Sequence, residues 1–299
     1  MKIRFSAEVE SSIISEMPVL ALESTIITHG MPHPENVEFA LEAESLCRQQ
    51  GVVPATISVI KGECCVGLKA SQIEFLAKDA STKKVSRREL GIAIARKWSG
   101  GTTVSATMHI AQKAGLSVFS TGGIGGVHRG AEKTFDVSQD LIALSQIPMV
   151  VVSAGAKAIL DLPMTLEALE TLGVPVFGFK TNEFTAFYSR NSGLYGLFRI
   201  ESPREAAHVY RKNLGSGLNS STLIVNPVPE KNEIPYNEIE KTIYGAIKYA
   251  GKKKIIGKDL TPFLLKEVVK KTAGRSLETN RALAINNVNL GIQISKELF

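Results

Sequence analysis

The sequence predicts a single α/β domain built around a largely parallel sheet. Through most of the 299 residues, short runs of apolar and β-branched residues alternate with longer segments of helical periodicity. This alternation is typical of parallel sheets, in which a helix connects each strand to the next. There is no internal repeat, no low-complexity tract and no linker rich in proline or serine, so one domain over residues 1–299 is the simplest organisation.

Six short runs, mostly apolar, are predicted to be strands. They are residues 18–22, 55–60, 116–120, 149–153, 174–178 and 221–225. Gly51, Gly115 and Gly173 lie before three of these runs and indicate where the preceding helices stop. Ligands bind at the carboxyl ends of the strands in such sheets, so functional residues are expected just after the first, third and fourth runs.

Amphipathic segments between these runs are predicted to be helices. They are residues 34–50, 87–98, 107–114, 141–146, 165–172, 203–214 and 238–250. In the C-terminal portion, about 257–299, Leu, Ile and Val at helical spacing predict two further helices, 260–274 and 277–298, that pack on the core. Residues 226–235 contain three prolines and are predicted to form a connecting loop.

The composition is that of an ordinary soluble globular protein, with 44% hydrophobic and 21% charged residues. The net charge of +6 favours anionic ligands, but part of the excess lies in residues 252–254, Lys258 and residues 270–271, where a solvated helix face explains it. Trp98 is the single tryptophan, so the stacking platforms of a single-strand binder are not evident. We therefore expect no nucleic-acid partner.

The three cysteines do not form a disulfide framework. Cys64 and Cys65 are adjacent and cannot easily bridge to each other, and Cys47 leaves an odd count. This usage favours a reducing compartment. The N-terminus does not have the pattern of a signal peptide, and no run of eighteen apolar residues occurs, so we expect a cytoplasmic protein without a membrane partner.

The first candidate site segment, ALESTIITHGMPHP at residues 21–34, places Glu23 at the end of an apolar strand. Burial there raises the pKa of a carboxyl group and makes it a candidate proton donor. The same position also suits a carboxylate that only caps the following loop. His29 and His33 are possible ligands, but the neighbouring prolines favour a role in loop rigidity.

The second segment, TKKVSRREL at residues 82–90, is strongly basic. Basic groups at a helix N-terminus oppose the helix dipole, which is tolerable when an anion binds there. Lys84 or Arg87 can then meet a phosphate or a negative substrate oxygen. Ser86 and Glu89 also form a plausible capping box, in which case the arginines only decorate a helix start.

The third segment, STGGIGGVHRGAEKTFDVSQD at residues 120–140, follows a predicted strand. Four glycines allow backbone N–H groups to approach an anion closely, and His128 and Arg129 add charge and donors, so the loop suits phosphate. The segment is neither a P-loop nor a dinucleotide fingerprint. A flexible glycine loop packed under a neighbour is the alternative.

The end of the same segment offers oxygen ligands. Asp136 and Asp140 are four residues apart, and a helix that begins near Ser138 aims all three side chains toward one pocket. Hard oxygen ligands suit Mg²⁺ or Mn²⁺, and Mg²⁺ needs only one or two carboxylates. As helix caps, Asp136 and Ser138 would be equally ordinary.

The fourth segment, MVVVSAGAKAILDL at residues 149–162, carries Lys157 after a buried strand, with no acidic residue before Asp161. A lysine in apolar surroundings loses its proton more readily, and a free amine is a nucleophile that can form an iminium with a sugar. The alternative is a lysine that extends to the surface along its apolar stem.

Several motifs together resemble one known family. They are ALESTIITHGMP, KVSRREL, GGTTVSATM, STGGIGGVHRGAEKTFDVSQDL, SAGAKAILDL, NPVPE and GKDLTPFLLKEV. In this order, and over residues 18 to 297, the chain resembles the pseudouridine-5′-phosphate glycosidase family, also called the indigoidine synthase A family. Residues 182–220 offer little to match.

The resemblance implies a cytosolic, Mn²⁺-dependent homotrimer with a three-layer α/β/α core. Its reaction is the reversible cleavage of the C–C glycosidic bond of pseudouridine 5′-phosphate, which yields uracil and D-ribose 5-phosphate. Direction and pathway, whether degradation or pigment-related metabolism, stay open at this point.

The resemblance also implies roles for individual residues. Lys157 is similar to the nucleophile that forms an imine with C1′ of the ring-opened ribose, Glu23 to the proton donor, and Asp136 to the metal ligand. Positions similar to substrate-contacting residues are Lys84, Val104, Ser138, Gln139 and Asp140, with His128 at the phosphate end and Asn280, in SLETN, at the uracil.

Two other functions are considered. A sugar-phosphate or nucleoside kinase also uses glycine-rich loops at strand ends, but it needs a catalytic base in a Gly-Ala-Gly-Asp type motif, which the sequence does not contain. An inactive ligand-binding homologue would keep the pocket, although the joint presence of Glu23, Lys157 and Asp136 favours an enzyme.

Overall fold

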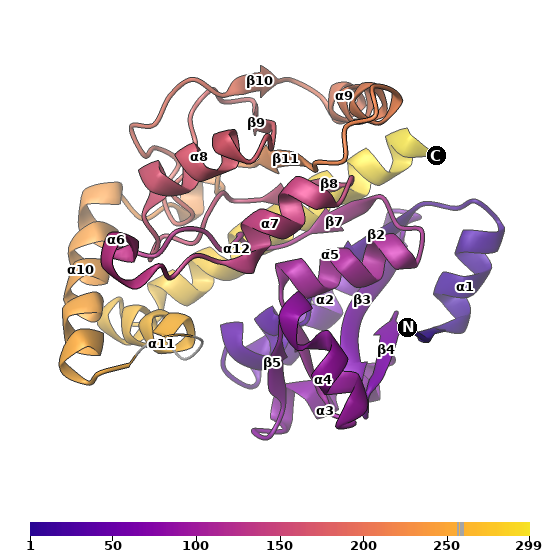
Figure 1. Ribbon diagram of the computed structural model, residues 1–299, viewed down its shortest axis with the longest axis horizontal. Coiled ribbons are helices and arrows are strands. Elements are labelled where there is room, and N and C mark those ends of the chain that lie inside the picture. Colours follow the sequence, from indigo (N-terminus) through magenta and orange to yellow (C-terminus); the bar gives the residue numbers. More distant parts are fainter. Residues whose placement is uncertain (256, 258–259) are drawn as a thin grey trace.

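The computed structural model describes residues 1–255, 257 and 260–299, and Figure 1 shows its arrangement. The described residues form one eleven-stranded sheet flanked by helices. Its strands are β1 (Ile3–Phe5), β2 (Val19–Leu22), β3 (Val53–Ile60), β4 (Glu63–Val66), β5 (Lys83–Val85), β6 (Gly100–Thr102), β7 (Val118–Ser120), β8 (Val150–Ser153), β9 (Val176–Phe179), β10 (Phe198–Ile200) and β11 (Thr222–Val225).

The sheet is mostly parallel. Its main path runs β1-β4-β3-β2-β7-β8-β11-β9-β10, while β6 pairs with both β3 and β5. The antiparallel pairs, β3 with β4 and β3 with β6, both use the second half of β3. The first half of β3 pairs in parallel with β2, so this strand joins a small mixed sheet to the large parallel one.

Helices connect most of these strands. They are α1 (Ala7–Ile14), α2 (Glu35–Gln49), α3 (Ala70–Lys78), α4 (Leu90–Ala95), α5 (Val104–Lys113), α6 (Ala131–Thr134), α7 (Gln139–Gln146), α8 (Leu162–Thr171), α9 (Pro203–Gly215), α10 (Tyr236–Lys252), α11 (Leu260–Lys271) and α12 (Arg275–Leu298). Short helical turns also occur at η1 (Ile26–Gly30), η2 (Arg87–Glu89) and η3 (Glu230–Asn232).

Helices cover both faces of the sheet. On one side α5 contacts β2 and β3 and packs against α7, which contacts α8. On the other side α12 contacts β2, β7 and β8 and packs against α2 and α9. Figure 1 shows α5 and α7 in front of the strands and α12 behind them. The predicted three-layer α/β/α arrangement is therefore confirmed.

The sequence accounts for the element boundaries. Strands β2, β8 and β11 are buried along their whole length, as expected for apolar runs covered on both faces. Ser138 and Asp161 cap α7 and α8 by accepting the N–H of Asp140 and Met164. Gly115 and Gly173 follow α5 and α8 with φ of +79° and +66°, the left-handed conformation that ends helices.

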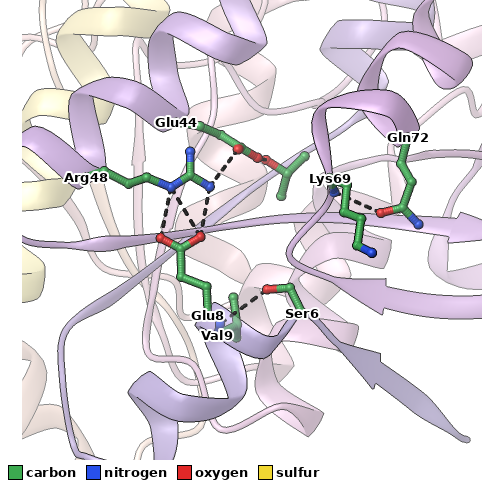
Figure 2. A network of polar contacts seen from close by, with 8 residues as sticks. Ser6, Glu8, Val9, Glu44, Arg48, Lys69 and Gln72 are labelled. Atoms are coloured by element: carbon green, nitrogen blue, oxygen red, sulfur yellow. Dashed lines mark hydrogen bonds and ion pairs between the residues drawn. The ribbon is translucent and has the colours of Figure 1, made fainter.

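Figure 2 shows how the N-terminal helix is attached to the rest of the fold. Arg48 on α2 donates to both carboxylate oxygens of Glu8 on α1 and to Glu44 on α2. Glu44, which is buried, also accepts a hydrogen bond from the Thr56 hydroxyl of β3 at 2.7 Å. Burial raises the pKa of Glu44, and its hydrogen bond to Thr56 and the charge of Arg48 oppose that rise.

The predicted strands and helices all occur, with ends shifted by a few residues. The exception is the predicted helix 87–98, whose length is wrong. It divides into η2 and α4 and stops at Ala95, because Lys97 turns the chain with φ of +51° into β6. The prediction missed β1, β4, β5, β6 and β10 and the helices α1, α3 and α6, which are all short.

Two further predictions concern residues near 258 and the absence of a membrane-spanning helix. Lys258 of the basic cluster, and residue 259 of the predicted C-terminal region, lie outside the described residues. Within the described residues, no helix has the length and apolar character needed to cross a membrane.

Candidate active site

A cavity of about 860 Å³ lies at the carboxyl ends of neighbouring parallel strands. Glu23 directly follows β2, Gly122 lies two residues after β7, and Lys157 lies four residues after β8. Because β2, β7 and β8 are adjacent in the sheet, these three positions meet at one edge. The cavity therefore lies at the carboxyl ends of the strands, where the sequence predicts the functional residues.

The cavity brings together side chains that are far apart in the sequence. All the predicted site residues line it: Glu23, Lys84, Val104, His128, Asp136, Ser138, Gln139, Asp140, Lys157 and Asn280. His29 and Ser86, which the sequence also offered as candidates, line the cavity as well. His33 and Arg87 are not in its lining: His33 is exposed, and the Arg87 guanidinium donates a hydrogen bond to Gln146 at 2.8 Å.

Glu23 is a buried acid in the cavity wall, and its side chain contacts the end of the neighbouring strand β7. It is 8% exposed, and the hydroxyl of Thr121, directly after β7, donates a short hydrogen bond to its Oε1. Burial raises the pKa of Glu23, while the positive charge of Lys157 and the Thr121 hydrogen bond act in the opposite direction. A carboxyl group of this kind can hold a proton and release it to a bound substrate.

Lys157 lies in a turn that pairs with the glycine segment after β7. Its backbone N–H donates to the Ile124 carbonyl at 3.0 Å, and the Ala154 N–H donates to the Gly122 carbonyl at 2.9 Å. Its Nζ donates a short hydrogen bond to the Gly123 carbonyl. The turn therefore fixes the amine at the wall of the cavity and does not direct it along the protein surface.

The glycine segment owes its composition mainly to close packing. A Cβ on Gly123 would lie 2.6 Å from the Phe187 ring, and a Cβ on Gly126 would collide with the Thr165 side chain. The N–H of Gly125 already donates to the Asp140 carboxylate at 2.9 Å. The predicted direct approach of these amides to an anion is thus not supported at Gly125, and the packed-loop alternative describes these glycines better.

Asp140 joins two elements beneath the cavity. One carboxylate oxygen accepts the Gly125 N–H, and the other accepts the Ser105 N–H at 2.9 Å, near the start of α5. The N-termini of α5 and α7 therefore lie side by side, with Val104, Ser138 and Asp140 in the wall. Two helix N-termini of this kind create a positive potential, and the Asp140 carboxylate already offsets part of it.

Lys84 adds a positive charge to this part of the cavity. Burial lowers the pKa of Lys84, and repulsion from Lys157 lowers it further, while Asp140 and Glu23 oppose the shift. An anionic group bound beside both ammonium groups would relieve this repulsion. Ser86 and Glu89 form the predicted capping box, with the Ser86 N–H donating to Glu89 at 3.0 Å.

His128 and Asp136 face the same cavity from the loop around α6. The N–H of His128 donates to the backbone carbonyl of Asp136 at 3.0 Å. Burial lowers the pKa of His128, and the negative charge of Asp136 opposes that shift. Among the described residues, no group of three or more His, Cys, Asp or Glu side chains could hold a metal ion.

Sequence reasoning missed several residues of the site. Thr121 follows a predicted strand, so the strand-end argument that found Glu23 applies to it equally. Phe187 lines the cavity from a loop with no sequence signal, and its φ of +60° is unusual for a residue with a side chain. Asn287 on α12 donates to the Thr121 carbonyl at 2.8 Å and supports the site from below.

Comparisons with known proteins are consistent with this arrangement. Residues 8–297 match the sequence profile of the family described as "Indigoidine synthase A like protein". Relatives named pseudouridine-5′-phosphate glycosidase include one from Petrotoga mobilis, 48% identical with 97% of this chain and 95% of the relative covered. Another, from Caldanaerobacter subterraneus subsp. tengcongensis, is 50% identical with 99% and 96% covered.

Two solved structures share the fold. An indigoidine synthase A-like protein from Thermotoga maritima has a TM-score of 0.90 and 38% identity, with 98% of this chain and 95% of that chain covered. The prealnumycin C-glycosynthase AlnA, solved in complex with ribulose 5-phosphate, has a TM-score of 0.91 and 34% identity, with 99% and 96% covered.

The sheet-edge cavity, its buried acid and the named relatives define an α/β enzyme. The class of protein predicted from the sequence is thereby confirmed. More particularly, the chain belongs to the indigoidine synthase A-like family, the family that the sequence motifs indicate.

Proposed function

We propose that the protein is a pseudouridine-5′-phosphate glycosidase that cleaves the C–C bond between ribose C1′ and uracil C5. The names of the relatives support this substrate. The observation that carries the proposal is the pair of Glu23 and Lys157, an acid and an amine at the ends of β2 and β8 that line one cavity. A C-nucleotide offers no basic atom at the scissile bond, so the chemistry of ordinary glycosidases serves it poorly.

In the first step, the amine of Lys157 attacks C1′ and the bond from C1′ to the ring oxygen O4′ breaks. The ring oxygen takes the proton that Nζ loses, and the open-chain sugar is joined to Nζ, which keeps a lone pair, by a new C–N bond. The hydrogen bond from Nζ to the Gly123 carbonyl holds the amine in place for this attack.

In the second step, Glu23 gives its proton to C5 of uracil. The electrons of the C1′–C5 bond remain with uracil, and the nitrogen lone pair of Lys157 forms a C=N bond with C1′. Water then adds to this iminium and releases ribose 5-phosphate and the free lysine. The raised pKa of Glu23 suits the role of acid in this step.

The phosphate end of the substrate fits the positive part of the cavity. Lys84, His128 and the N-termini of α5 and α7 surround that part. We place the uracil toward Asn280 on α12, whose side chain offers both a donor and an acceptor to the base.

A divalent cation fits Asp136. Both carboxylate oxygens of Asp140 accept backbone N–H groups, so Asp136 is the carboxylate that we propose as a ligand. Carboxylate and water oxygens suit Mn²⁺ or Mg²⁺, and few protein ligands are needed. Bound there, Mn²⁺ would supply positive charge beside the phosphate end of the substrate.

The direct test is incubation with pseudouridine 5′-phosphate and Mn²⁺ in the absence of ATP, with uracil measured by chromatography. Release of uracil and ribose 5-phosphate is the expected result. Turnover only with ATP would favour the kinase alternative, and binding without turnover would favour an inactive homologue. The reverse experiment, from uracil and ribose 5-phosphate, tests reversibility. The homotrimer and the cytoplasmic location stay predictions, to be tested by light scattering and by fractionation of cells.

Substitution Lys157→Ala tests the nucleophile. We expect it to abolish uracil release and the adduct that borohydride traps from ribose 5-phosphate, because no amine remains to form the imine. The control is Lys113→Ala, at an exposed position in the last turn of α5. An adduct of unchanged yield in Lys157→Ala, measured by mass spectrometry, would exclude Lys157 as the nucleophile.

Substitution Asp136→Ala tests the cation site. We expect Mn²⁺ binding, measured by titration calorimetry, to weaken by at least about tenfold. Glu132→Ala on α6 removes an exposed carboxylate nearby and should leave the titration unchanged. Equal Mn²⁺ affinity in Asp136→Ala and the unaltered protein would remove Asp136 from the site.

A further inference from the structure

Arg129 lies behind the cavity wall and makes four side-chain hydrogen bonds. Its Nε donates to the Leu160 carbonyl and one Nη donates to the Ala158 carbonyl, both at 3.1 Å. Both Nη atoms also donate to the carboxylate of Glu240, one of them at 3.0 Å and the other closer. About a quarter of the Arg129 side chain and a third of the Glu240 side chain are exposed.

These partners connect Arg129 to the residues that carry the proposed chemistry. Ala158 directly follows Lys157, and Leu160 pairs with His128 across an antiparallel bridge. Arg129 itself directly follows His128. One guanidinium therefore holds the turn that presents the amine and the loop that presents the imidazole.

Glu240 adds a third element to this connection. It lies on α10, which packs against α11, and α11 contributes Thr261, Pro262 and Leu265 to the cavity wall. The carboxylate fixes the guanidinium plane through a two-pronged contact, so the remaining N–H groups point at the two carbonyls. Lysine carries the same charge but cannot donate in these three directions from one rigid plane.

We propose that Arg129, oriented by Glu240, is a positioning residue that fixes the Lys157 turn for attack on the sugar. This inference rests on the proposed function. Arg129 lies behind the wall and acts through the Ala158 and Leu160 carbonyls, so it governs the geometry of imine formation and not the affinity for substrate. A shift of about 1 Å in a reacting group costs on the order of 100-fold in rate.

A second glutamate on α10, Glu238, provides the matched control for Glu240. Glu238 on α10 forms an ion pair with Arg275 at 2.9 Å, and both side chains are about half exposed. An exposed pair of this kind contributes little to stability. Glu238→Gln and Glu240→Gln thus remove the same charge from the same helix, but only Glu240→Gln releases the guanidinium that holds the Lys157 turn.

The experiment measures the rate of borohydride-trapped adduct from ribose 5-phosphate, together with kcat and KM for pseudouridine 5′-phosphate, in folded protein. We expect Glu240→Gln and Arg129→Lys to slow trapping and kcat by about 10- to 100-fold, with KM changed by less than about threefold. Glu238→Gln should behave as the unaltered enzyme. If Arg129 and Glu240 only stabilise the fold, their variants should have a lower melting temperature but should not show a fall in kcat at nearly constant KM.

The outcomes separate this inference from the proposed function. If the unaltered enzyme forms the adduct and Glu240→Gln and Arg129→Lys form it at the same rate, the positioning role is wrong and the proposed function stands. If Glu238→Gln slows trapping as much as Glu240→Gln, the effect belongs to α10 in general and the inference is also wrong. An unaltered enzyme that forms no adduct overturns both.

Discussion

At the scale of single residues, the site rests on the opposing proton requirements of two groups. Glu23 must hold a proton until uracil departs, and Lys157 must present an uncharged amine. Burial favours the protonated form of Glu23, and the Thr121 hydroxyl opposes it by donating to the carboxylate. The balance between these influences decides the pH range in which the acid works.

Thr121→Val should change the pH dependence of turnover in a predictable direction. The Thr121 hydrogen bond stabilises the ionised carboxylate and so lowers the pKa of Glu23. Without it the pKa rises, the acid stays protonated to higher pH, and the alkaline fall of kcat should move to higher pH. Profiles of kcat against pH for both proteins check this, with Thr171→Val, at an exposed position at the end of α8, as control.

A shift of the alkaline limb to lower pH, or none, would show that Glu23 is not the acid that limits the rate. In Glu23→Gln the alkaline limb should disappear, and kcat should fall by about 10²- to 10⁴-fold. Trapping of the ribose 5-phosphate adduct should persist there, because the amine of Lys157 is retained.

The sequence predicted residues that line the cavity better than it predicted what surrounds them. Glu23 and Lys157 follow apolar strands, and position at a strand end is local information that the chain displays directly. Phe187 and Asn287 were missed because their neighbours in space are distant in sequence. The Phe187 ring reaches the site only because Gly123 leaves room for it, a contact between residues 64 positions apart.

At the scale of elements, the glycine segment and α7 fit together through side chains that leave no room for a Cβ. A Cβ on Gly125 would lie 2.7 Å from the Asp140 carboxylate and would overlap the Ser138 hydroxyl. Ser138 caps α7, and Asp140 ties α7 to the start of α5. One added methyl group would therefore disturb two helix N-termini.

Gly125→Ala should destabilise the protein by about 1–3 kcal/mol, because the overpacked cap must move. Gly122→Ala is the matched control, since its Cβ would find its nearest neighbour at 3.6 Å. It should change the free energy of unfolding by less than about 0.5 kcal/mol. Urea denaturation of both variants measures the difference, and equal midpoints would contradict the packing argument.

Element prediction succeeded for the long helices and for strands that lie inside longer apolar runs, and it failed for most of the strands of three residues. The buried runs of β2, β7, β8 and β11 and the long helices were identified. Strands such as β5 and β6 contain three residues each, too few to show alternation. The place of β6 is decided by its pairing with β3, which lies at least 40 residues earlier in the chain, and β5 in turn pairs with β6.

At the scale of the whole molecule, α12 unites the two halves of the fold. It crosses behind β2, β7 and β8 and packs against α2 and α9 (Figure 1). It also carries Asn280 into the cavity wall. Its Asn287 accepts a hydrogen bond from Asn226 at 3.1 Å and donates to the carbonyl of Thr121. The sequence predicted this helix, its position on the core and, through the family resemblance, Asn280 as a site residue, but not the support that Asn287 gives to the end of β7.

Gly291→Leu should be strongly destabilising. A Cβ at this position would lie 3.0 Å from the Leu20 side chain and 3.3 Å from Ser120, so a larger side chain would push α12 away from the sheet. We expect a loss of about 1–3 kcal/mol or more in the free energy of unfolding. Gly215→Leu, at the end of α9 with open space around it, is the control. Similar melting temperatures for the two variants would show that the contact yields easily.

The place of α12 in the layer behind the sheet has a consequence for biosynthesis. A chain that is still being translated can pair β2, β7 and β8 early, but the apolar face that α12 covers stays uncovered until residues 275–298 have left the ribosome. Nascent chains of this protein should therefore need chaperone protection until α12 has emerged, and they should acquire protease resistance only after that point.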